Sequence, residues 1–160
     1  MAKNKEEKTN VMRTLDQKKI PYTAHSYDPD GPIDGVSVAQ ILGQSAEQVF
    51  KTLVTKAASG AYYVFDIPVA ENLDLKKAAK AVGEKSVAML PQKELLPLTG
   101  YVHGGCSPVG MKKQFPTVFH ETAPLYGAIC VSAGKIGHQV ECDPNALIAL
   151  LRAKTADVIV

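Results

Sequence analysis

The segment YVHGGCSPVGMKKQFPT, residues 101–117, concentrates the residue types from which a ligand-binding loop can be built. Consecutive glycines, Gly104 and Gly105, let the backbone approach a ligand closely and aim N–H groups at one point, as in an anion nest or an oxyanion hole. Ser107 adds a hydroxyl, and Pro108 restricts the backbone. A bulge or a hairpin turn uses glycines in the same way, so the residues alone leave both interpretations open.

Lys51 is a second candidate because it stands inside VFKTLVTK, residues 49–56, a run with strand character. If this run alternates, both of its faces are largely apolar, and a lysine is unusual on either face. It is either a lysine that snorkels at a strand edge or an ammonium that lines a pocket and meets a phosphate or a polarised oxygen. Ser132 lies between a predicted strand and a second glycine-rich turn. It is either an ordinary turn serine or a side chain that faces the same pocket.

The thiols and imidazoles allow two further chemistries. Cys106 lies beside backbone amides that could lower its pKa, and His103 is three residues away, so a cysteine nucleophile with a histidine base is one interpretation. His103 and Cys106 could also combine with His138 and Cys142 as four zinc ligands, but neither spacing matches a familiar zinc module. The sequence shows no acidic partner for a histidine base and no paired carboxylates. We therefore expect neither a metal nor a cofactor.

The composition is that of a globular protein. The chain has 160 residues, of which 46% are hydrophobic and 21% charged, and we expect one domain over residues 1–160 with a flexible start at residues 1–9. No apolar run approaches the roughly 20 residues of a membrane helix, and the charged start is not a signal peptide. Three cysteines without a C-x-x-C pair fit reduced thiols, so we expect a cytoplasmic location. A net charge of +2 permits contact with nucleic acid only at a few phosphates.

Several elements must position these residues. Asp74 and Asp143 have the place of helix N-caps, and Gly83 follows the alanine-rich helix that Asp74 begins. The pattern predicts strands at 22–27, 49–56, 61–68, 86–90, 116–120, 127–134 and 138–142, and helices at 4–19, 36–42, 74–83, 91–98 and 143–153. Neighbouring strands joined by short turns favour antiparallel pairs. We therefore predict the α+β class, with a mixed, largely antiparallel curved sheet and surrounding helices.

Three segments together, VFKTLV at 49–54, GGCSPVGMKK at 104–113 and VSAGKIGHQVE at 131–141, resemble the YbaK/EbsC family in order and spacing. Its members are free-standing relatives of the editing domain inserted in bacterial prolyl-tRNA synthetases. The resemblance extends over nearly the whole chain and, through GGCSPVGMKK, is strongest to the Cys-tRNA(Pro) deacylase branch. It implies a single editing domain with that family's sheet. The implied activity is deacylation of an amino acid esterified to the terminal adenosine of a mischarged tRNA.

The resemblance also implies roles for single residues. Lys51 matches the family's pocket lysine, which is expected near the terminal phosphate and sugar. Gly104 and Gly105 match the loop whose backbone holds the aminoacyl carbonyl, and we expect all three to be catalytic. Tyr27 matches a tyrosine near the mouth of the pocket, and Ser132 matches a pocket serine.

The remaining expected substrate-binding residues are Ser107 and Pro108 in the loop and Gln139. Gln139 falls where some family members place an aspartate, and a glutamine cannot act as a base. In the cysteine-specific branch no protein nucleophile is needed, because the substrate's own thiol attacks its ester carbonyl and releases a thiolactone. The protein then contributes orientation and oxyanion stabilisation.

The implied partners are a tRNA acceptor end that carries an amino acid, and prolyl-tRNA synthetase, which presents it. Three alternatives stay open. The same fold could edit another ester, for example Ala-tRNA(Pro), with water as the nucleophile. It could be a non-catalytic tRNA-binding module. It could also be a thiol enzyme that depends on Cys106.

Overall fold

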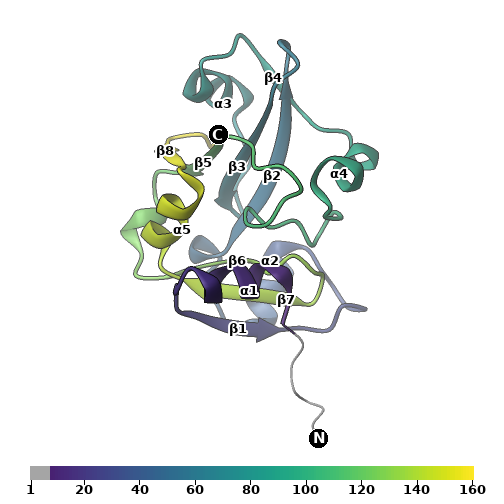
Figure 1. Ribbon diagram of the computed structural model, residues 1–160, viewed down its shortest axis with the longest axis vertical. Helices are drawn as coiled ribbons and strands as arrows, with labels where there is room; N and C mark the ends of the chain where they lie inside the picture. The colour runs from purple at the N-terminus through teal and green to yellow at the C-terminus, as the bar shows by residue number, and fades with distance from the viewer. Residues whose placement is uncertain (1–7) are drawn as a thin grey trace, which may run out of the picture.

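The computed structural model describes residues 8–160, which form two sheets with helices packed against them (Figure 1). The smaller sheet is antiparallel and has the order β1 (Tyr22–Ser26), β7 (His138–Cys142), β6 (Ile129–Ser132). The larger has the order β4 (Val87–Met89), β2 (Phe50–Ala57), β3 (Tyr62–Pro68), β5 (Thr117–His120), β8 (Lys154–Ala156). A parallel bridge between Val49 and Cys130 links the two sheets. The predicted α+β class is confirmed, and its curved sheet is divided in two.

The smaller sheet has a helix on each face. Helix α1 (Asn10–Gln17) buries its apolar side against β6 and β7, in a core that contains Leu15, Val131 and Val140. Helix α2 (Gly35–Leu42) lies at the other face, where Ala39 packs near Cys130. The order of side chains along a strand explains this arrangement, because successive residues of β6 and β7 point to opposite faces.

Helix α1 is shorter than the predicted helix over residues 4–19. Thr9 has an extended backbone (φ −79°, ψ 169°), and its hydroxyl accepts a hydrogen bond from the Met12 N–H at 3.2 Å, so Thr9 is the N-cap of the helix. The part of the prediction before residue 8 lies outside the described residues. Residues 1–7 of the predicted flexible start lie there as well.

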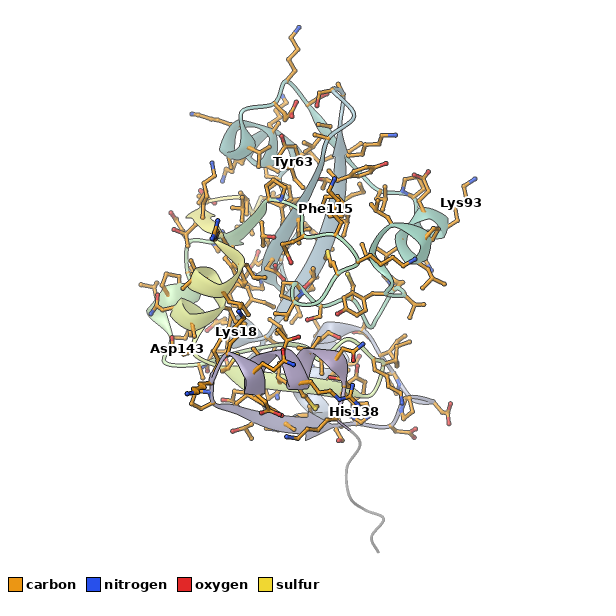
Figure 2. The ribbon with its side chains drawn as sticks, in the orientation of Figure 1. Lys18, Tyr63, Lys93, Phe115, His138 and Asp143 are labelled. Carbon is orange, nitrogen blue, oxygen red and sulfur yellow. The ribbon has the colours of Figure 1, made fainter. Side chains whose placement is uncertain are left out.

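The larger sheet is covered by α3 (Leu75–Val82) on one face and by α4 (Gln92–Thr99) with the loop of residues 100–116 on the other. The Asp74 carboxylate accepts the N–H groups that begin α3, and Gly83 ends the helix with φ +74°, as the sequence predicts. Figure 2 shows Lys93 of α4 pointing outward and Phe115 over the sheet, where its ring lies 5.4 Å from that of Tyr62.

The last element, β8, is a strand that the sequence pattern did not predict. Helix α5 (Pro144–Leu151) begins after the predicted N-cap Asp143 and leads into β8. Strand β5 pairs in parallel with β3 and with β8, whereas β2 and β3 form the predicted antiparallel hairpin. Short 3₁₀ turns occupy Ala46–Gln48 and Ala123–Leu125. In the described part of the chain, every helix is too short or too polar to cross a membrane.

Candidate active site

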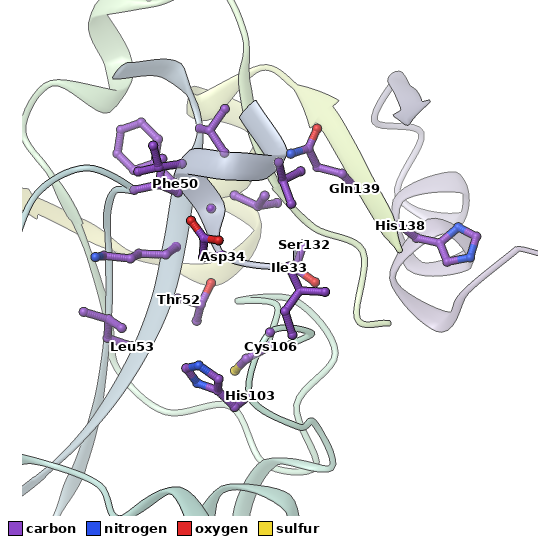
Figure 3. Close-up of a pocket in the computed structure, with 18 of the residues that line it drawn as sticks. Ile33, Asp34, Phe50, Thr52, Leu53, His103, Cys106, Ser132, His138 and Gln139 are labelled. Carbon is purple, nitrogen blue, oxygen red and sulfur yellow. The ribbon is translucent and has the colours of Figure 1, made fainter. Parts of the chain in front are cut away.

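A cavity of about 310 Å³ lies where the two sheets meet (Figure 3). Its wall comes from the start of α2, the start of β2, the glycine loop at residues 103–106, and the adjoining ends of β6 and β7. Of the site residues predicted from the sequence, the cavity brings together Tyr27, Lys51, Gly104, Ser132 and Gln139. Segments that are far apart in the sequence therefore converge on one space, and the roles of these residues remain predictions.

Three of the predicted residues support the cavity from behind instead of lining it. Ser107 is fully buried, and its hydroxyl accepts a hydrogen bond from the Val109 N–H at 3.2 Å. Pro108 is buried beside it. A Cβ atom on Gly105 would lie only 3.0 Å from the backbone nitrogen of Ile136, so this glycine allows the two glycine-rich loops to touch.

The backbone of the glycine loop limits which amides can face a ligand. Gly104 has φ +90°, a conformation that glycine adopts readily and other residues rarely do. The Gly105 N–H donates to the Val102 carbonyl at 3.0 Å and closes a turn. The Gly105 N–H is therefore not free to hold a carbonyl, whereas Gly104 and Cys106 are among the residues that line the cavity.

Lys51 lines the cavity and is partly buried. Burial lowers the pKa of its ammonium, and the carboxylate of Glu71 opposes this effect. The predicted alternation of β2 does not decide which residues reach the cavity, since Phe50, Lys51 and Thr52 all line it. The reason is that the cavity surrounds the end of β2, where the chain leaves the larger sheet and Val49 bridges to the smaller one.

Cys106 is not an activated nucleophile, which corrects one interpretation of the sequence. The sequence allowed that backbone amides lower the pKa of this thiol. Instead, burial, together with the carboxyl of Asp66, raises the pKa of the Cys106 thiol to about 12. The thiol is 9% exposed and packs with Met111 and Phe115. The thiolate needed for nucleophilic attack is therefore absent near neutral pH.

Thr52 and Asp66 form a buried pair that the sequence analysis missed. They are direct partners in the register of β2 and β3, and the Thr52 hydroxyl donates to Oδ1 of Asp66 at 2.6 Å. Asp66 is fully buried, and burial raises the pKa of its carboxyl to about 7, while the Thr52 hydrogen bond opposes the shift. Its Oδ2 atom has no hydrogen-bond partner within residues 8–160. A lone carboxylate in the apolar run YYVFDIP was the available signal.

Gln139 is held by another glutamine. Its side chain is 4% exposed, and its amide exchanges hydrogen bonds with that of Gln44, at 2.6 Å to its oxygen and 3.3 Å from its nitrogen. This amide pair fixes the orientation of Gln139 and joins β7 to Gln44, which follows the C-cap residue of α2. The side chain therefore serves as a fixed wall of the cavity.

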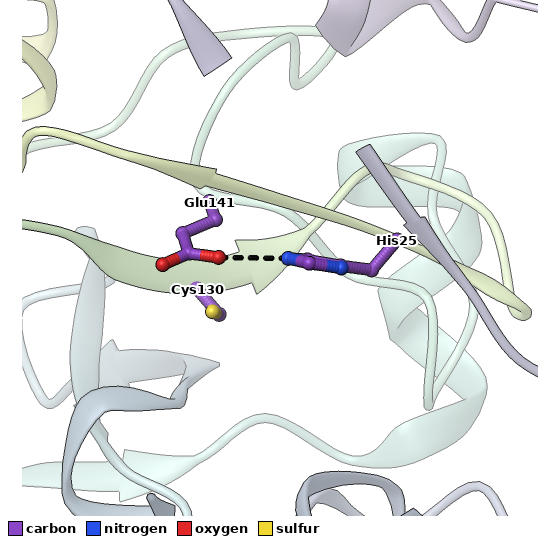
Figure 4. A group of neighbouring side chains, drawn as sticks. All are labelled: His25, Cys130 and Glu141. Atoms are coloured by element: carbon purple, nitrogen blue, oxygen red, sulfur yellow. Dashed lines mark hydrogen bonds and ion pairs between the residues drawn. The ribbon is translucent and has the colours of Figure 1, made fainter. Parts of the chain in front are cut away.

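The four proposed zinc ligands do not converge, because Cys142 packs in the core under α1 while His103 and Cys106 line the cavity. A different group lies together on the smaller sheet, as Figure 4 shows. His25, Cys130 and Glu141 have ligand atoms within 4.8 Å of one another, and Nε2 of His25 lies 2.7 Å from Oε1 of Glu141. In the described residues, this contact between the two side chains joins β1 to β7.

Comparisons with known proteins identify the family and the fold of this chain. Residues 34–150 match the family described as the aminoacyl-tRNA editing domain. A protein of Enterococcus faecalis, named as a candidate Cys-tRNA(Pro)/Cys-tRNA(Cys) deacylase EbsC, is 47% identical over 160 residues, which cover 99% of this chain and 98% of that protein. A structure described as a candidate trans-editing enzyme for prolyl-tRNA synthetase has a TM-score of 0.80 at 25% identity and covers 94% of each chain.

The fold alone is also shared with a protein described only as hypothetical. Its crystal structure has a TM-score of 0.86 at 22% identity and covers 94% of this chain and 99% of that one. The match to the family extends over most of the chain, from Asp34 at the start of α2 into α5. This chain belongs to the aminoacyl-tRNA editing domain family.

Proposed function

We propose that this protein is a trans-editing deacylase that clears Cys-tRNA(Pro). The observation that carries the proposal is the cavity between the sheets, which offers a lysine and a glycine loop but no ionised thiol. The 47% identical Enterococcus faecalis protein, whose name includes the same substrate, supports the choice of ester. The nucleophile then has to arrive with the substrate or as water.

The chemistry uses the thiol of the cysteinyl group. Its sulfur attacks the ester carbonyl and loses its proton, and the C–O bond to the ribose breaks, so the ribose hydroxyl regains a proton and a cysteine thiolactone leaves. Backbone N–H groups of Gly104 and Cys106 would stabilise the oxyanion that forms during this attack. Lys51 would bind the terminal phosphate and sugar and so orient the ester.

The weak net charge favours assistance in tRNA binding. A charge of +2 supplies few phosphate contacts, so intrinsic affinity for tRNA should be low. We propose that prolyl-tRNA synthetase presents the acceptor end to the cavity. The solved relative described as a trans-editing enzyme for that synthetase supports this partner.

Release of amino acid from Cys-tRNA(Pro), Ala-tRNA(Pro) and Ser-tRNA(Pro) tests the proposal. We expect the cysteinyl ester to be cleaved at least about tenfold faster than the other two. An intramolecular thiol has a high effective molarity and therefore attacks the carbonyl faster than water from bulk solvent does. Trapping of the thiolactone would identify the nucleophile. Rapid alanine release with inert cysteine would instead support the alternative with water as the nucleophile. Inertness toward all three esters, with tRNA binding intact, would support a binding module.

Substitution of Cys106 separates the substrate's thiol from the protein's. We expect Cys106→Ala to keep deacylation of Cys-tRNA(Pro) within about threefold of wild type, because the buried thiol is not ionised. Single-turnover rates at pH 8 measure this directly. A loss of all activity by a folded Cys106→Ala variant would assign the attack to Cys106.

A further inference from the structure

The buried pair of Thr52 and Asp66 controls what the cavity can accept from a ligand. Thr52 lines the cavity, while Asp66 lies behind it and is fully buried. An ionised carboxylate only accepts hydrogen bonds, so above the Asp66 pKa of about 7 the Thr52 hydroxyl must be the donor in their 2.6 Å hydrogen bond. A hydroxyl has a single proton. Only the lone pairs of Thr52 therefore remain available to the cavity.

The position of Thr52 indicates which ligand group would meet these lone pairs. Thr52 and the glycine-loop residues His103, Gly104 and Cys106 line the same cavity. Figure 3 draws Thr52, Cys106 and His103 among the residues of its wall. In an aminoacyl ester the α-amino nitrogen is separated from the carbonyl carbon by a single atom. A carbonyl held at the loop therefore keeps its α-amino group inside the same cavity, whose wall includes Thr52.

We propose that the Thr52 hydroxyl accepts a hydrogen bond from the α-amino group of the bound aminoacyl ester. Asp66 is then a positioning residue, because it binds the hydroxyl proton and so directs the lone pairs of Thr52 toward the cavity. The proposal rests on the proposed function, and it adds a subsite for an amine. An α-amino group donates in both its protonated and its neutral form, so it suits an acceptor at any assay pH.

Two charged groups line the cavity together with Thr52. Lys51 is a cation and repels an ammonium, whereas the Asp34 carboxylate, which accepts the Ser37 N–H at 3.1 Å as the N-cap of α2, keeps lone pairs that can share an ammonium with Thr52. The remaining titratable groups that line the cavity are Tyr27, His103, Cys106 and His138. For none of these side chains does the structure of residues 8–160 give a hydrogen bond that would hold a lone pair in one direction, as the bond to Asp66 does for Thr52.

Two unreactive probes test the subsite without any deacylation. One is 3′-deoxy-3′-(cysteinylamino)adenosine, an amide that cannot release its ribose. The other is the matching 3-mercaptopropanoyl amide, which lacks only the α-amino group. We expect wild type to bind the cysteinyl amide about tenfold more tightly by calorimetry at pH 8, as one hydrogen bond to a charged group predicts.

Four variants then test whether Thr52 and Asp66 cause the preference for the cysteinyl amide. Thr52→Val removes the hydroxyl and Asp66→Val removes its partner, and each should reduce the tenfold preference to about twofold or less. Thr52→Ser keeps a hydroxyl and should keep the preference. The double variant Thr52→Val with Asp66→Val should lose no more than Thr52→Val alone, because Asp66 acts through Thr52. A merely structural role would weaken both probes equally.

Other outcomes would overturn the subsite. They are an unchanged preference in either valine variant, an equal loss for both probes, or no preference in wild type. Melting temperatures guard against misfolding, and Asp66→Val should melt no lower than wild type at pH 8, since it removes a buried charge. Absence of deacylation by wild type, with the amine preference intact, would count against the proposed function alone.

Discussion

Lys51→Ala should lose about 100-fold or more in the single-turnover rate of Cys-tRNA(Pro) deacylation. Lys51 is the only lysine among the described residues that line the cavity. Removing a contact that orients a substrate commonly lowers the rate by a factor of this size. Because burial lowers the pKa of Lys51, the fold disfavours its charged form, and the variant should unfold at no lower a temperature than wild type.

Lys56 offers the matched control for Lys51. It lies on the same strand, β2, but it is exposed and stacks 5.7 Å from the centre of the Tyr62 ring, outside the cavity. Lys56→Ala should deacylate at close to the wild-type rate. If the two lysine variants behaved alike, the cavity would have no specific need for its ammonium, and Lys51 would be a snorkelling lysine after all.

Asp66 should make the protein less stable as the pH rises through neutrality. The carboxyl has a pKa of about 7 in the folded state, against 3.8 for the ordinary group, so between these values the folded state binds more protons than the unfolded state. The free energy of unfolding therefore falls with rising pH. From pH 5 to pH 8 the fall due to this group is about 3 kcal/mol, since each pKa unit corresponds to roughly 1.4 kcal/mol.

Asp66→Asn isolates this contribution, because the amide has similar size and cannot ionise. Urea unfolding at pH 5, 6, 7 and 8 should show that the wild type loses stability relative to Asp66→Asn as the pH rises. The difference should level off above about pH 7, where the carboxyl is ionised in the folded and the unfolded state. A difference that stays constant from pH 5 to pH 8 would show that the Asp66 carboxyl does not change its ionisation in this range.

The sequence predicts local structure well where a residue itself sets the boundary. Strand β7 occupies the predicted residues 138–142, and α3 runs between its predicted caps, Asp74 and Gly83. The pairing of strands that are far apart in the sequence is harder to predict. The parallel alignment of β5 with β3, and the division into two sheets, depend on contacts between segments that no local pattern encodes.

The candidate site shows the same contrast. Lys51 could be selected from the sequence because a lysine is unusual in an apolar strand, and Gly104 and Ser132 because they lie at glycine-rich turns; the cavity brings the three together. The commitment of the Gly105 N–H to Val102 could not be foreseen, since it depends on the turn that the loop adopts. Asp66 escaped notice because its importance arises from the partner strand that places Thr52 beside it.

The state of the cysteines has a consequence for a protein that handles a thiol substrate. Cys106, Cys130 and Cys142 are all free and buried, and burial raises the pKa of each thiol to about 12. Thiol–disulfide exchange requires a thiolate and an accessible sulfur, so these side chains take little part in it. If the proposed function holds, a cysteinyl substrate would enter this cavity and a thiolactone would leave it without the protein being captured in a mixed disulfide by its own ligand.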